Sequence, residues 1–157
     1  MSILPNPQLD FPILYEDEDL IIVNKPSGLP CHPLKPEEIN TVANFLVAHD
    51  PRFQGLGDDA REAGLVHRLD NETSGALIAA KNQKTYESLR RDFSQRKINK
   101  EYLAIVDGHP QDKQKITWPI GLHPKSQKRV KVYFQPATAR QAKAQEAITT
   151  YEVLEKF

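Results

Sequence analysis

The densest group of polar residues that could perform chemistry lies between residues 67 and 75. The segment stands between two apolar stretches and reads His67-Arg68-Leu69-Asp70-Asn71-Glu72-Thr73-Ser74-Gly75. A loop between two strands can aim its side chains into a cleft, because the strands hold both of its ends. This loop is therefore the first candidate for an active site.

Two kinds of catalysis suit the residue types of this loop. Asp70 and Glu72 could act as the acid and the base of a glycoside hydrolase. His67 and Asp70 could instead activate the hydroxyl of Ser74 as a nucleophile. No rule of sequence spacing brings these side chains into contact, so the pattern alone leaves both reactions open.

Two further interpretations need no such reaction. His32, His67 and Asp70 could bind a metal ion, although no pair of histidines has a recognisable ligand spacing. Alternatively, Asp70, Thr73 and Ser74 could bond to their own backbone in a turn that has no function beyond structure.

The segments that flank the loop predict the elements that would position it. Residues 65–67, which begin with Leu-Val, and the apolar residues 76–80 predict one strand on each side of the loop. Asn82 predicts the cap of a helix that ends at about Gln95. The apolar face of that helix would carry Tyr86, Leu89 and Phe93.

The remainder of the chain predicts mainly short strands. Residues 41–48 predict a helix capped by Asn40 or Thr41. Strands are predicted at residues 13–15, 20–24, 102–106, 116–120, 130–134 and 148–153. Short strands with two modest helices indicate an α+β fold, with a mixed or antiparallel sheet and a few packed helices.

Composition narrows the class of protein. The chain has 157 residues and one cysteine, Cys31, which excludes an intramolecular disulfide and a cysteine-cluster zinc site. No apolar run approaches the ~18 residues of a membrane span, and the N-terminus lacks the features of a secretory signal. We therefore expect a cytoplasmic protein with no membrane partner. Three prolines predict that residues 1–12 are an extended lead-in to one domain at 13–157.

The charges are divided unevenly along a chain whose net charge is zero. Residues 1–60 carry 10 acidic and 3 basic side chains, whereas residues 61–157 carry 11 acidic and 18 basic ones. Basic residues concentrate at 81–100 and at 125–143. Affinity for a polyanion depends on the local surface, so these two stretches could bind nucleic acid. They could equally be solvated lysines and arginines with no partner.

The segment at residues 64–75, followed by Ala80-Lys81, closely resembles the catalytic motif of the RluA-type RNA pseudouridine synthases. Two flanking stretches agree in order and spacing. Residues 15–28 resemble the first motif of that family, and residues 100–108 resemble its tyrosine-bearing strand. The resemblance extends from about Ile13 to Phe157, and implies the pseudouridine synthase catalytic fold.

The resemblance implies a reaction and roles for three residues. Asp70 matches the catalytic aspartate, which attacks the target uridine at carbon 6 or at the ribose anomeric carbon. The base then detaches, rotates and is rejoined through carbon 5, with no cofactor and no metal. Tyr102 matches the tyrosine that stacks on the flipped base, and Arg68 matches the arginine that fills the gap the nucleotide leaves.

RNA is therefore the expected partner, either ribosomal or transfer RNA. The residues that we expect to contact it are Arg68, His67, Lys81, Arg90, Arg91, Lys100, Lys128 and Arg129. Among these, His67 is expected to position its neighbours rather than to carry a proton. Lys25, Pro26 and Gly28 are expected to shape a turn near the site, and Gly75 to let the backbone pass closely. Cys31 and His32 are expected to be ordinary loop residues.

In the family, the strand that ends this chain leads to another strand and then to a segment of the Gly-Arg-Thr-His-Gln type, followed by a basic residue. The resemblance implies that this residue pairs with the catalytic aspartate. We therefore expect the domain at 13–157 to lack its C-terminal part. The alternative function is that of a catalytically impaired, RNA-binding fragment of such an enzyme.

Overall fold

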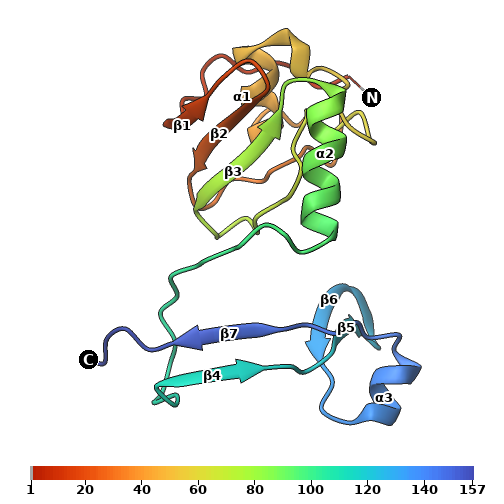
Figure 1. The fold of residues 1–157 in the computed structure, drawn as a ribbon. Helices are drawn as coiled ribbons and strands as arrows, with labels where there is room; N and C mark the ends of the chain where they lie inside the picture. Colours follow the sequence, from red (N-terminus) through yellow and green to blue (C-terminus); the bar gives the residue numbers. More distant parts are fainter. Residues whose placement is uncertain (1) are drawn as a thin grey trace. The chain divides into compact units, whose positions relative to one another are not determined.

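The computed structural model describes residues 2–157, apart from the side chains of Gln127 and Lys128. The chain divides into two units, Met1–Glu101 and Tyr102–Phe157 (Figure 1). The first unit contains the whole of the candidate loop.

The first unit is built on a three-stranded antiparallel sheet with the order β1-β2-β3. Strand β1 is Ile13–Glu16, β2 is Leu20–Lys25 and β3 is Gly75–Ala80. The acidic turn between β1 and β2 closes through Asp17, whose carboxylate accepts hydrogen bonds from the amides of Asp19 and Leu20, each at 2.8 Å. The predicted strands at 13–15, 20–24 and 76–80 are thus confirmed.

One face of this sheet covers the main core. The register pairs Ile21 with Ala79 and Val23 with Leu77, so these four side chains project from the same face. Helix α1, Val42–His49, packs there, and is followed by a short 3-10 turn at Pro51–Phe53. The Thr41 hydroxyl caps α1 by accepting a hydrogen bond from the backbone amide of Asn44. In turn, the Asn44 side-chain oxygen accepts a hydrogen bond from the backbone amide of Thr41.

The other face carries helix α2, Gln83–Ser94, which lies alongside β3 (Figure 1). Its apolar stripe forms a second cluster in which buried Tyr86 packs with Val66 and Ala80, and with the half-buried Leu89 and Phe93. The Asn82 side chain caps the helix through the Thr85 amide, as predicted.

The second unit contains two separate antiparallel pairs. Strand β4, Lys113–Ile116, pairs with β7, Thr149–Glu152. Strand β5, Ile120–His123, pairs with β6, Ser126–Val132, and a short helix, α3, spans Pro136–Gln141. The strand predicted at 148–153 is confirmed as β7, and the one at 130–134 overlaps the end of β6. The one predicted at 116–120 is wrong, because these residues mainly link β4 to β5, and α3 was not anticipated.

Two predicted strands are absent from the described chain. Residues 65–67 form only an isolated bridge, between Leu65 and Ala79. Residues 102–106 have no regular structure, and Leu103 is 88% exposed. Alternating apolar residues form a strand only where another strand pairs with them, and no strand of the described chain pairs with this segment.

Residues 2–12 contain no helix or strand, but they do not stand apart from the core. Ile3 and Phe11 are buried in the main cluster, and the Phe11 ring lies 4.4 Å from the ring of Phe45. Among the described helices, none is long and apolar enough to cross a membrane.

The core of the first unit makes a stability prediction. Leu77 is fully buried, so Leu77→Ala should lower the free energy of unfolding by about 2–5 kcal/mol, through the transfer energy of the missing methyl groups and a residual cavity. The same change at Leu34, which is 78% exposed, should cost under about 0.5 kcal/mol. Urea unfolding followed by circular dichroism measures both. Equal effects would show that Leu77 is not a core residue.

Candidate active site

The candidate loop runs from the bridge at Leu65 to the start of β3. It contains a tight turn in which the amide of Thr73 donates to the carbonyl of Asp70, at 3.1 Å. The turn is a backbone feature, so it leaves the Asp70 carboxylate available for other contacts.

A buried lysine holds the residue that follows Asp70. Lys25 ends β2 on the core-facing side and has no exposed surface. Its Nζ donates to the carbonyls of Leu29 at 2.7 Å, Asn71 at 2.9 Å and Pro26 at 3.0 Å. An ammonium group has three donors, and all three are used. The lysine therefore ties the loop at Asn71 to the turn that follows β2.

The turn after β2 adds two further bonds to the same loop. The Gly28 amide donates to the Asn71 carbonyl at 2.8 Å, and the Ser27 hydroxyl donates to the Glu72 carbonyl at 2.8 Å. Gly28 has a φ of 83°, a backbone conformation that favours glycine. The prediction that Lys25 and Gly28 shape a turn beside the site agrees with these contacts.

The residue that precedes Asp70 is held by a cysteine. The Cys31 thiol is buried and donates to the Leu69 carbonyl at 3.3 Å, while the Leu69 amide donates to the same sulfur at 3.4 Å. Cys31 is thus more than an ordinary loop residue. Together with Lys25 it fixes the main chain on both sides of Asp70.

Asp70 itself is exposed. In the part of the chain that the structure describes, no side chain bonds to its carboxylate, so the group projects from a fixed backbone into solvent. Such a carboxylate can attack an electron-poor carbon or accept a proton.

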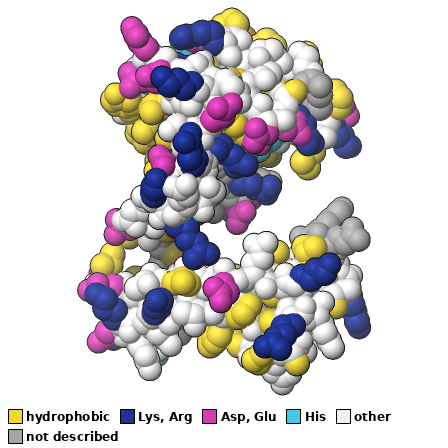
Figure 2. Space-filling model, turned by 45° about the vertical axis from the view of Figure 1, so that its right-hand side comes forward, with side chains coloured by type: hydrophobic (Ala, Val, Ile, Leu, Met, Phe, Trp, Pro, Cys, Tyr) yellow, Lys and Arg dark blue, Asp and Glu magenta, His cyan; other side chains and the backbone are white. Residues whose placement is uncertain are grey.

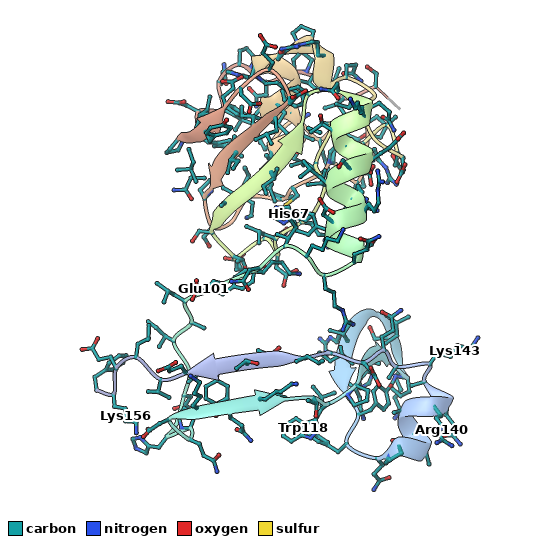
Figure 3. All side chains as sticks on the ribbon, in the orientation of Figure 1. His67, Glu101, Trp118, Arg140, Lys143 and Lys156 are labelled. Carbon is teal, nitrogen blue, oxygen red and sulfur yellow. The ribbon has the colours of Figure 1, made fainter. Side chains whose placement is uncertain are left out.

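His67 is held from two sides. Its Nε2 accepts a hydrogen bond from the amide of Ile78 at 3.2 Å, and its ring stacks on Phe93 with 4.8 Å between ring centroids. Figure 3 labels His67 near the end of α2. Burial, and secondarily the charge of Lys100, lowers its pKa to about 4. His67 is therefore neutral at pH 7, with its proton on Nδ1, and its expected role in positioning its neighbours stays a prediction.

Four basic side chains surround His67. Arg68 and Lys100 line an open groove of about 690 Å³ together with Arg90 and Arg91 of α2. The other described lining residues are Asp58, Val66, His67, Phe93 and Ser94. We call this feature the basic groove. Figure 2 shows several lysine and arginine side chains close together on the surface of the first unit.

A second pocket of about 690 Å³ lies on the other side of Arg68. It is lined by Leu69 and Asn71 of the loop, by Cys31 and His32, and by acidic residues that include Glu37. Burial lowers the pKa of His32, whose Nδ1 lies 3.1 Å from the Arg61 carbonyl oxygen. Acidic side chains repel a phosphate chain, so the basic groove is the better candidate of the two for binding RNA.

Gly75 serves a different purpose from the one expected. A Cβ at this position would meet no atom within 4 Å, so the backbone makes no close approach there. Its φ is 134°, which is costly for any residue with a side chain. The backbone conformation at the start of β3 is therefore what requires glycine.

Tyr102 is the first residue of the second unit and is 56% exposed. It lies in the segment that has no regular structure. Its expected role, stacking on the flipped base, stays a prediction.

Lys81 differs from the predicted RNA-contact residues. Its side chain is 6% exposed, its Nζ lies 2.7 Å from a carboxylate oxygen of Glu16, and it donates to the Asp17 carbonyl at 2.5 Å. Hydrogen bonds from Lys81 and His49 hold the pKa of Glu16 below its usual range. Lys81 ties the end of β3 to β1, and is not available to RNA.

The last two predicted RNA contacts lie in β6. Arg129 is exposed there, while the side chain of Lys128 lies outside the described residues. Among the residues that the structure describes, no three His, Cys, Asp or Glu side chains are placed to hold a metal ion. The alternative with His32, His67 and Asp70 as ligands therefore has no support from the described geometry.

The tight turn thus carries an exposed aspartate, is held by a buried lysine and adjoins a basic groove through Arg68. The family model described as RNA pseudouridylate synthase matches residues 19–157. Because the match covers most of the chain, the chain belongs to this family.

Its relatives support the same assignment. An uncharacterized RNA pseudouridine synthase of Synechocystis is 37% identical over 146 residues, which cover 92% of this chain and 43% of that protein. Ribosomal large subunit pseudouridine synthase D of Nitrosomonas europaea is 38% identical, with coverage of 92% and 39%. The chain thus spans less than half the length of these relatives.

A solved structure agrees with the fold. Human RNA Pseudouridylate Synthase Domain Containing 1 superposes with a TM-score of 0.70 at 25% identity, over 98% of this chain and 56% of that one. The α+β fold predicted from the sequence, with antiparallel sheets and a few packed helices, is that of the pseudouridine synthases.

Lys25 makes a prediction about the loop. Lys25→Met keeps most of the length of the side chain but removes three donors. The carbonyls of Pro26 and Leu29 then lose the lysine as their donor, at about 1–3 kcal/mol for each group that stays unsatisfied away from water, while Asn71 keeps its bond from Gly28. We expect a lower free energy of unfolding, and faster hydrogen exchange at the Gly28 amide relative to the amides of β2 and β3. Lys84→Met, at an exposed position of α2, is the matched control and should change neither. Unchanged exchange at Gly28 would contradict the anchoring role.

His67 makes a prediction about pH. Its folded pKa of about 4 lies below the ordinary value of 6.5, so the unfolded chain takes up a proton first as the pH falls. The contribution of this residue to stability is therefore complete above pH 6.5, and is lost progressively between pH 6.5 and pH 4. NMR titration of the ring should give a midpoint near 4, with His67→Asn used to assign the signal. A midpoint near 6.5 would rule out the buried, neutral ring.

Proposed function

We propose that this chain supplies the catalytic aspartate of an enzyme that isomerises uridine to pseudouridine in structured RNA. The observation that carries the proposal is the position of Asp70, exposed on a loop whose main chain is held on both sides by Lys25 and Cys31. The class of reaction that we propose comes from the family to which the chain belongs.

In the proposed reaction, the Asp70 carboxylate adds to carbon 6 of the uracil ring or to carbon 1′ of the ribose. The bond between N1 and carbon 1′ breaks, and the base rotates while it stays in the site. A bond between carbon 5 and carbon 1′ then forms, the proton lost from carbon 5 is balanced by one taken up at N1, and Asp70 is released. Atoms and charge balance without a redox partner, so the carboxylate is the main chemical group the protein must provide.

The target must leave the base stack before Asp70 can reach it. Extrusion of a nucleotide costs a few kcal/mol. The exposed guanidinium of Arg68, two residues before Asp70, can fill the gap and offset part of that cost by stacking. Tyr102, by its family match, would stack on the flipped uracil, at about 1–3 kcal/mol per base.

We further propose that the substrate is RNA of the large ribosomal subunit. Several relatives, including the one from Nitrosomonas europaea, are named ribosomal large subunit pseudouridine synthase D. The name belongs to those proteins and supports ribosomal over transfer RNA for this one.

Each unit carries basic side chains that could contact the RNA. Arg90, Arg91 and Lys100 belong to the first unit, and Arg129 belongs to the second. Long-range attraction to phosphates is screened over about 10 Å by salt, so only such local groups contribute to binding.

A second candidate function rests on the share of the relatives that the chain covers. A chain that matches 43% of a relative can bind RNA through its basic residues without completing the catalytic site. An RNA-binding fragment with impaired catalysis is therefore the competing proposal, and an assay of tritium release separates the two.

Release of tritium from RNA labelled at carbon 5 of uridine tests the proposal. Asp70→Asn removes the nucleophile with little change of shape, and should reduce release on the order of a thousandfold or more. Glu72→Gln makes the same acid-to-amide change two residues away and should retain release, which also tests the hydrolase alternative.

Three outcomes are informative. Release that depends on Asp70 but not on Glu72 supports the synthase. Binding of RNA with no release by the unaltered chain supports the RNA-binding fragment. Release that survives Asp70→Asn, with circular dichroism unchanged, would overturn the assignment of Asp70.

A further inference from the structure

The basic groove has cationic walls from three separate segments. Arg68 comes from the candidate loop, Arg90 and Arg91 from the last turns of α2, and Lys100 from the chain that follows it. Asp58 is the only acidic residue among the described lining residues. Four like charges around one groove repel one another, so their free energy falls when an anion enters.

These cationic side chains make few of the described contacts that hold the fold together. Within the described residues, Arg68, Arg91 and Lys100 form no ion pair, and Arg90 has one weak hydrogen bond, to the Val66 carbonyl at 3.4 Å. By contrast, Arg52 and Arg61 of the same unit each pair closely with an aspartate. The groove therefore gathers four cations for which the described residues provide no ion-pair partner.

A structural explanation accounts for only part of this pattern. A cation in the last turn of a helix is stabilised by the negative end of the helix dipole, which suits Arg91. The dipole does not explain why Arg68 and Lys100, from outside the helix, line the same groove. A shared ligand explains all of them.

The groove is also lined by two stacked rings, those of His67 and Phe93, whose centroids are 4.8 Å apart. The His67 ring is neutral at pH 7, because burial lowers its pKa to about 4. Neutral aromatic rings beside several cations suit a phosphodiester with its sugar, because the sugar can pack on the rings while guanidinium groups bind the phosphate oxygens in pairs.

The groove also adjoins the proposed reaction site. Arg68 lines it, and Arg68 lies two residues from Asp70, which limits the distance between their Cα atoms to about 7 Å. We propose that the basic groove binds a backbone phosphate of the RNA strand beside the target uridine, through Arg90, Arg91 and Lys100 and without regard to the base. This inference rests on the proposed function for the identity of the strand.

Binding of a short single-stranded RNA, measured by fluorescence anisotropy across a range of salt concentrations, tests the groove. The double variant Arg90→Gln with Arg91→Gln should bind more weakly. Its slope of log K against log salt should be smaller by about 0.7 for each phosphate that the variant no longer neutralises. Lys84→Gln with Arg96→Gln removes two exposed charges of the same region from outside the groove, and should leave the slope unchanged.

Further binding measurements identify the chemical class of the ligand. The weakening should be equal for polyuridylate and polyadenylate, because a phosphate contact carries no base information. Polyglutamate should compete poorly, since carboxylates do not reproduce a phosphodiester on a sugar. Arg91→Gln alone, whose side chain makes no described contact with the fold, should show part of the weakening with unchanged circular dichroism.

The results separate this inference from the proposed function. The phosphate site would be rejected if the groove variant and the control variant bound RNA equally. It would also be rejected if the weakening were confined to one base, or if polyglutamate competed as well as RNA. Asp70→Asn should bind RNA as the unaltered chain does. Groove-dependent binding without tritium release would retain the phosphate site while rejecting the reaction.

Discussion

The burial of Lys25 is the constraint on which the site depends. Strand alternation places Ile21, Val23 and Lys25 on the same face of β2, so a side chain with a charged end must enter the core. An unpaired ammonium there would cost several kcal/mol. Three carbonyls offset that cost, and one of them belongs to Asn71, 46 residues further along the chain. The core therefore tolerates this lysine only when the candidate loop is in place.

The same constraint separates what is rigid from what is free. The residues on either side of Asp70 are fixed by main-chain contacts, at Leu69 through Cys31 and at Asn71 through Lys25 and Gly28. The side chains of Arg68 and Asp70 remain exposed. In the proposed reaction, a flipped base would meet a carboxylate whose backbone is already fixed, which would lower the entropy lost on reaching the transition state.

Local signals in the sequence predicted most of the first unit. Helix α2 follows from its cap at Asn82 and its apolar stripe, and β2 and β3 follow from apolar runs between turns. The contacts that position Asp70 were not predictable in this way. The bond between Cys31 and Leu69 joins residues 38 apart, and no spacing rule connects a thiol to a distant backbone. The strand expected at 102–106 failed for a related reason, because apolar alternation does not reveal whether a pairing strand exists.

Lys81 and Arg90 illustrate why charge counts along a chain locate a binding surface only coarsely. Both belong to the basic stretch at 81–100, and both contribute equally to its net charge. Lys81 lies at the end of β3 and is buried against Glu16, so its charge is neutralised by a carboxylate oxygen 2.7 Å away. Arg90 lies on the helix surface, and its one described bond is to an uncharged carbonyl. Burial and partner therefore decide which charge reaches a polyanion, and both depend on tertiary structure.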